Sequence, residues 1–127
     1  DATYERLNEN AAIAIMPWGG SKGSVQAAYE ILVSEPAFKE NIAWYYTMYI
    51  HPLPTELLVE LKNKDLVIVP ELNYQGQFSS YLRSLGVNAE SIVQYTGLPF
   101  KGDVLAKKIA DRIAVNAKNS AKVKVER

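Results

Sequence analysis

Glycine and polar residues gather in short segments of the sequence that directly follow apolar runs. Backbone N–H groups at the start of a helix attract phosphate or carboxylate, and a nearby lysine adds positive charge. These segments are therefore candidates for an anion site or for an edge that docks another domain. The candidate residues are Gly19, Gly20, Ser21, Lys22, Gly23, Glu71, Asn73, Gly76, Gln77, Thr96 and Gly97.

The first segment runs from Trp18 to Ser24 and reads Trp-Gly-Gly-Ser-Lys-Gly-Ser. It is not a P-loop, because no Gly-Lys pair followed by Ser or Thr occurs, and it is not a Gly-x-Gly-x-x-Gly fingerprint. The simplest interpretation is a tight turn between a strand and a helix, with Ser21 or Ser24 as the helix N-cap. A bound anion and docking against a neighbouring domain are the alternatives.

Glu71 and Asn73 form a polar pair after another apolar run. A carboxylate beside an amide can orient a substrate or bridge to another subunit. We favour a simpler interpretation, in which Asn73 bonds within a turn and the segment caps a helix that begins near Gln77. Glu71 is a poor candidate for a general base, because the sequence pairs it with no second titratable group.

His51 stands between an apolar segment and Pro52, and we interpret it as a turn residue rather than a catalyst. The neighbouring aromatic residues are expected to pack within a strand or to form an interface. Those residues are Trp44, Tyr45, Tyr46 and Tyr49. The sequence supports neither a Ser-His-Asp triad nor a metal cluster, so we predict no catalytic, cofactor-binding or metal-binding residue in this chain.

The apolar spacing predicts the elements that position these segments. Continuous apolar runs followed by turn residues are typical of strands buried on both faces, and spacing of three and four is typical of helices. The expected strands are 11–16, 42–50, 66–69 and 91–95, and each is followed by a helical pattern. Gly86 is the expected C-cap of the third helix.

Alternation of strand and helix predicts a three-layer α/β/α open sheet, mainly parallel, with right-handed crossovers. Four strands are visible in the pattern, and a fifth is expected in an end segment if it exists. In such sheets ligands gather beyond the carboxyl ends of the strands. The polar segments that follow the four expected strands would lie at those ends.

Composition limits the classes of function. The chain has 127 residues, which fits one domain. Its 14 basic and 14 acidic residues give a net charge of zero, which argues against a general electrostatic hold on nucleic acid or an anionic membrane. A chain without cysteine cannot hold an iron–sulfur cluster through thiolates, and a single histidine makes a structural zinc site unexpected. No apolar run reaches the roughly 20 residues of a membrane span, and we expect a cytoplasmic setting.

We expect residues 1–10 to form a connecting arm, residues 11–115 to form the domain, and residues 116–127 to form a polar C-terminal tail. The first residue is Asp1 rather than Met, which fits a processed chain or an excised domain. An excised domain would be part of a larger subunit.

Four motifs in one order resemble the α subunits of 2-oxoacid:ferredoxin oxidoreductases. Trp18–Gly23 is similar to that family's glycine, serine, lysine, glycine turn, and His51–Pro54 to its aromatic-Pro-Leu-Pro turn. Val69–Gln77 resembles a strand-end segment in which Glu, Asn, Gly and Gln recur, and Tyr95–Phe100 resembles the closing Thr-Gly-Leu-Pro-Phe pattern. The resemblance covers residues 11 to 115 and is closer to the 2-oxoglutarate or broad 2-oxoacid branch than to the pyruvate branch.

The resemblance implies a transketolase-C-terminal-like domain of an enzyme that converts a 2-oxoacid and coenzyme A to an acyl-CoA and carbon dioxide, with ferredoxin taking the electrons. Thiamine diphosphate, magnesium and an iron–sulfur cluster are implied for the complex. They would belong mainly to the preceding α-subunit domain and the β subunit, which are the implied partners. The resemblance implies no membrane or nucleic acid as partner and no activity for the isolated domain.

Two other interpretations stay open at this point. The chain could be the C-terminal domain of another thiamine diphosphate enzyme, with the same fold and a different electron acceptor. It could also be a free-standing module that binds a small anion at residues 19–24.

Overall fold

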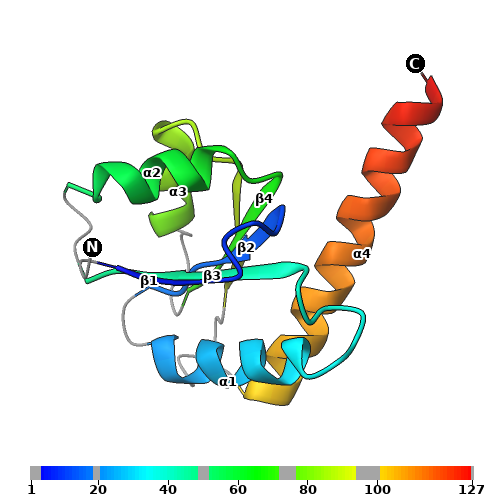
Figure 1. Cartoon of the computed structure of the whole chain (residues 1–127), viewed down its shortest axis with the longest axis horizontal. Coiled ribbons are helices and arrows are strands. Elements are labelled where there is room, and N and C mark those ends of the chain that lie inside the picture. Colours follow the sequence, from blue (N-terminus) through cyan, green and yellow to red (C-terminus); the bar gives the residue numbers. More distant parts are fainter. Residues whose placement is uncertain (1–3, 19–20, 49–51, 72–76, 94–100, 127) are drawn as a thin grey trace.

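The computed structural model describes residues 4–18, 21–48, 52–71, 77–93 and 101–126. Strands and helices alternate along the chain after a short first strand (Figure 1). The elements are β1 (Glu5–Leu7), β2 (Ile13–Ile15), α1 (Lys22–Val33), β3 (Ile42–Tyr46), α2 (Thr55–Lys62), β4 (Leu66–Glu71), α3 (Gln77–Ser84), β5 (Ala89–Val93) and α4 (Gly102–Glu126).

The strands form one five-stranded sheet in the order β1-β3-β2-β4-β5. β3, β2, β4 and β5 are parallel to their neighbours, and only β1 runs antiparallel, against β3. This arrangement confirms the predicted mainly parallel α/β/α sheet. The fifth strand lies in an end segment, as the sequence allowed.

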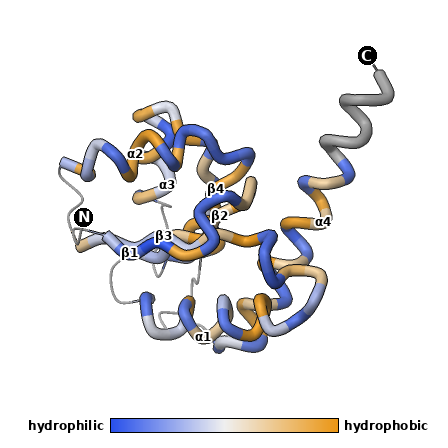
Figure 2. The backbone as a smooth tube through the Cα atoms, in the orientation of Figure 1, coloured by the Kyte–Doolittle hydropathy of each residue, from blue (hydrophilic) through white to orange (hydrophobic). Residues whose placement is uncertain are grey.

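Helices cover both faces of the sheet (Figure 1), and successive strand residues point to opposite layers. In β4, Val67 and Val69 pack toward α2 and α3, whereas Leu66 and Ile68 pack toward α1 and α4. All four of these side chains are fully buried. The apolar residues concentrate in the central strands and in separate patches along the helices (Figure 2). Burial on both faces explains why the central strands read as continuous apolar runs.

The two ends of the chain differ from the expectation. Residues 5–7, expected in a connecting arm, form β1 at the edge of the sheet. Residues 116–126, expected in a polar tail, continue α4, whose C-terminal half extends away from the other elements (Figure 1). Both segments are polar, so neither carries the apolar spacing by which an element is recognised. The division of the chain into arm, domain and tail stays a prediction.

Some strand ends lie a few residues away from their predicted positions. β3 ends at Tyr46, so Thr47 and Met48 lie beyond the strand that was expected to run to residue 50. The C-cap at Gly86 is confirmed: its φ of +91° is left-handed, and the Val87 amide donates to the Leu82 carbonyl at 3.1 Å.

The topology has a switch point between β2 and β4. From β2 the chain crosses to α1 on one face, and from β4 it crosses to α3 on the other face. After these two neighbouring strands the chain therefore continues on opposite faces of the sheet. Ligands of doubly wound sheets bind at such a switch point, beyond the carboxyl ends of the strands. Within the described ranges, no helix is long and apolar enough to cross a membrane.

Candidate functional site

Ser21 joins the turn after β2 to the end of β4. Its hydroxyl lies 2.9 Å from the Trp18 carbonyl and 3.2 Å from the Pro70 carbonyl, so it can donate to either. Ser21 stands at the N-cap position of α1 but makes no side-chain capping bond, contrary to the expected cap. The hydroxyl is instead buried and ties the turn after β2 to the end of β4.

Glu71, the last residue of β4, is fully buried. Its carboxylate accepts hydrogen bonds from the backbone amides of Phe78 at 2.7 Å and Ser79 at 3.3 Å. These amides belong to the first turn of α3, where negative charge is favourable. Glu71 therefore caps α3, which is the simpler of the two roles weighed for this segment.

Aromatic rings cover this part of the edge. Trp18 stacks on Phe78 with 5.7 Å between ring centroids and 14° between planes. Phe78 in turn lies 6.4 Å from the ring of Tyr81. Because Trp18 follows β2 and Phe78 lies in the first turn of α3, the stack holds the chain after β2 against the start of α3.

Lys22 points away from the switch point between β2 and β4. Its ammonium nitrogen lies 2.6 Å from the Glu5 carboxylate and 4.2 Å from the centroid of the Tyr46 ring. The hydrogen bond from Lys22 lowers the pKa of the Glu5 carboxyl, although burial acts in the opposite direction. A lysine that already neutralises a carboxylate has little charge left for an anion, so this geometry weakens the anion-site interpretation.

The structure brings some of the predicted residues together and separates others. Ser21, Glu71 and the exposed Gln77 lie around the switch point, whereas Lys22 and Gly23 begin α1. A side chain at Gly23 would meet no atom within 4 Å, so packing does not require glycine there. The remaining candidates lie outside the described residues: Gly19, Gly20, Asn73, Gly76, Thr96 and Gly97, together with His51.

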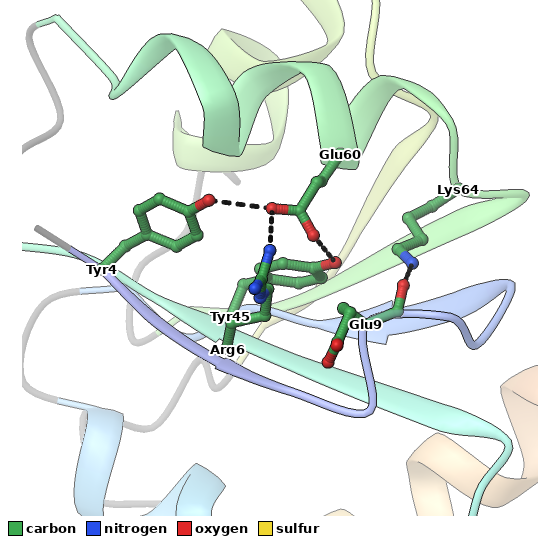
Figure 3. Close-up of polar contacts among 6 residues, drawn as sticks. All are labelled: Tyr4, Arg6, Glu9, Tyr45, Glu60 and Lys64. Atoms are coloured by element: carbon green, nitrogen blue, oxygen red, sulfur yellow. Dashed lines mark hydrogen bonds and ion pairs between the residues drawn. The ribbon is translucent and has the colours of Figure 1, made fainter. Parts of the chain in front are cut away.

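Sequence reasoning missed a polar cluster on the α2 side of the sheet (Figure 3). The Glu60 carboxylate accepts hydrogen bonds from the Tyr4 hydroxyl at 2.8 Å, the Tyr45 hydroxyl at 3.0 Å and the Arg6 guanidinium at 3.1 Å. Burial alone would raise the pKa of Glu60, but these hydrogen bonds outweigh it and lower that pKa. Burial and the bond to Glu60 raise the pKa of Tyr45, so this phenol stays protonated. The three donors are 15 to 56 residues away from Glu60 in sequence, so local spacing gives no sign of the cluster.

The described side chains of the strand-end edge bond the backbone, as Ser21 and Glu71 do, or stack on one another, as Trp18 and Phe78 do. In the described part of the chain, no group of three or more His, Cys, Asp or Glu residues could hold a metal ion. One large apolar side chain, Met48, is 80% exposed just beyond β3. The arrangement suits a rigid edge that presents its turns to another surface.

No protein-family model and no curated protein matches the sequence. Among solved structures, the chain is similar to 2-oxoglutarate:ferredoxin oxidoreductase from Magnetococcus marinus, determined with 2-oxoglutarate, coenzyme A and succinyl-CoA bound. The match has a TM-score of 0.69 and 26% sequence identity, and it covers 87% of this chain. The chain spans 19% of the length of that protein's chain. The four motifs and this structural match agree, and both support the 2-oxoacid:ferredoxin oxidoreductase family.

Proposed function

We propose that the chain is the transketolase-C-terminal-like domain of an α subunit in a 2-oxoacid:ferredoxin oxidoreductase. The parent complex would convert a 2-oxoacid and coenzyme A to an acyl-CoA and carbon dioxide and pass the electrons to ferredoxin. The observation that carries this proposal is the match over 87% of the chain to an oxidoreductase solved with 2-oxoglutarate, coenzyme A and succinyl-CoA. Substrates of that kind support 2-oxoglutarate, or a broader range of 2-oxoacids, as the substrate here.

Within that complex, the strand-end edge would pack against the preceding α-subunit domain and the β subunit and help to shape the substrate entrance. Two features of the described residues support a docking role over a catalytic one. The buried groups Ser21 and Glu71 bond the protein's own backbone, and Met48 offers an exposed apolar side chain at the same edge. Docking against another domain would bury such a side chain.

Thiamine diphosphate, magnesium and the iron–sulfur cluster would be held by the other domains of the complex. The absence of cysteine from this sequence agrees with a cluster held elsewhere. We also propose a cytoplasmic location, where a soluble ferredoxin can reach the complex.

The test is an activity assay on the native full-length protein, purified with the chains that accompany it. We expect ferredoxin reduction that requires both a 2-oxoacid and coenzyme A, with 2-oxoglutarate among the substrates used. Turnover that is independent of coenzyme A, or that uses an acceptor other than ferredoxin, would instead indicate another thiamine diphosphate enzyme with the same fold.

A further inference from the structure

Polar side chains hold β1 to the rest of the sheet from both faces. On one face, Tyr4 and Arg6 donate to the Glu60 carboxylate of α2 at 2.8 Å and 3.1 Å (Figure 3). On the other face, the Glu5 carboxylate accepts from Lys22 of α1 at 2.6 Å and from the indole N–H of Trp44 at 3.2 Å. The alternation follows from the two-residue period of a strand. Each face of β1 is thus fastened by an ion pair and a hydrogen bond.

Little apolar surface reinforces these contacts. The side chains of Glu5 and Arg6 are 49% and 45% exposed, and Leu7 is 53% exposed. β1 pairs with a single neighbour through three residue pairs, and none of its three residues belongs to a core cluster. Tyr4, directly before β1, packs against one cluster and is partly buried. Exposed ion pairs contribute little to stability and weaken with salt. β1 is therefore held far less firmly than the central strands.

A firm anchor begins directly after β1. Asn8 has a left-handed φ of +52°, a conformation that asparagine tolerates better than most residues. Its amide nitrogen donates to the Tyr29 hydroxyl at 3.1 Å and to the Ile42 carbonyl at 3.3 Å. Lys64 then donates to the carbonyl oxygens of Glu9 and Ala11. These bonds fix the chain from Asn8 onward to the central part of the domain.

Two of the groups that hold β1, Glu60 and Lys22, keep other partners if it leaves, whereas the Trp44 indole loses its Glu5 acceptor. Glu60 still accepts from the Tyr45 hydroxyl at 3.0 Å, and Lys22 still lies 4.2 Å from the Tyr46 ring. The buried residues of both core clusters begin at Ala11, so none belongs to β1. Loss of residues 4–7 therefore removes no buried core residue, only the partly buried Tyr4.

We propose that β1 is a detachable edge strand. Residues 4–7 leave β3 as a unit, with Asn8 as the hinge, while the four parallel strands stay folded. Detachment opens the outer edge of β3, with which β1 pairs. The inference concerns this edge alone and does not depend on the proposed enzyme.

Amide hydrogen exchange of the 127-residue chain, followed by mass spectrometry at neutral pH, tests the proposal. We expect the β1 amides to exchange at least tenfold faster than those of β2 and β4, because sub-global opening costs less than global unfolding. Raising the salt to 1 M should accelerate β1 further, because salt weakens exposed ion pairs, and leave β2 and β4 unchanged.

A double variant, Tyr4→Phe with Arg6→Gln, removes two anchors and leaves the Glu60–Tyr45 bond in place. We expect β1 exchange to rise about tenfold more, with β2 and β4 unaltered. Arg112→Gln is the matched control, because Arg112 pairs with Glu90 at the opposite edge of the sheet and should leave β1 unchanged. Exchange of β1 at the rate of β2 and β4, or a double variant that accelerates all three strands alike, would overturn the proposal.

Discussion

Replacing Glu71 by alanine tests whether one buried carboxylate organises the strand-end edge. The substitution removes the acceptor of the Phe78 and Ser79 amides, which lie 2.7 Å and 3.3 Å from the carboxylate. A buried amide without a partner costs about 1–3 kcal/mol. The second bond is long, and removing a buried carboxylate also removes its own desolvation cost, so the net loss should be roughly 2–3 kcal/mol.

A loss of that size lowers the melting temperature of a 127-residue domain by roughly 8–12 °C, at about 4 °C per kcal/mol. Thermal and urea unfolding of the isolated chain measure it directly. Glu71→Gln keeps one carbonyl oxygen as acceptor and should lose about half as much stability. Glu30→Ala, an exposed position on α1, is the matched control and should change stability by about 0.5 kcal/mol or less. An alanine variant that melts within about 2 °C of the parent would refute the capping role.

Two further predictions concern the chain alone. The pKa values of Glu5 and Glu60 lie below their ordinary value of 4.5. The stability that these two carboxylates contribute is therefore present above pH 4.5 and is lost as the pH falls through their lowered pKa values. Below pH 4.5 the urea midpoint should fall less steeply in Glu60→Gln than in the parent chain, and an identical pH profile would argue against the cluster. The isolated chain should bind no thiamine diphosphate in a calorimetric titration, and micromolar binding would place cofactor contacts in this domain.

The central parallel strands were predictable because most of their residues are buried. Leu66–Val69 can only be a buried segment, and the Gly86 turn follows from a glycine at a helix end. β1 was not predictable, because Glu5 and Arg6 are held by charges on Lys22 and Glu60, which are distant in sequence. Polar contacts of this kind leave no period in the sequence.

The candidate site was also predictable only in part. The position of the polar turns at the carboxyl ends of the strands follows from the α/β pattern. The partners of the individual side chains do not: Ser21 bonds Pro70 rather than capping α1, and Lys22 bonds Glu5 rather than facing the crevice. Which partner each side chain binds depends on which strands are neighbours in the sheet. β2 and β4 are neighbours only in the folded chain, because α1, β3 and α2 separate them in sequence.

We propose that the strand-end edge docks this domain into an oxidoreductase complex. Met48→Asp tests it, because this side chain is 80% exposed and its charge should not alter the stability of the isolated chain. Val59→Asp on α2 is the matched control, at a position 54% exposed. In the native full-length protein, we predict that Met48→Asp weakens co-purification of the partner chain and lowers ferredoxin reduction, whereas Val59→Asp leaves both unchanged. Full assembly and full activity in Met48→Asp, or equal losses in the two variants, would contradict the claim.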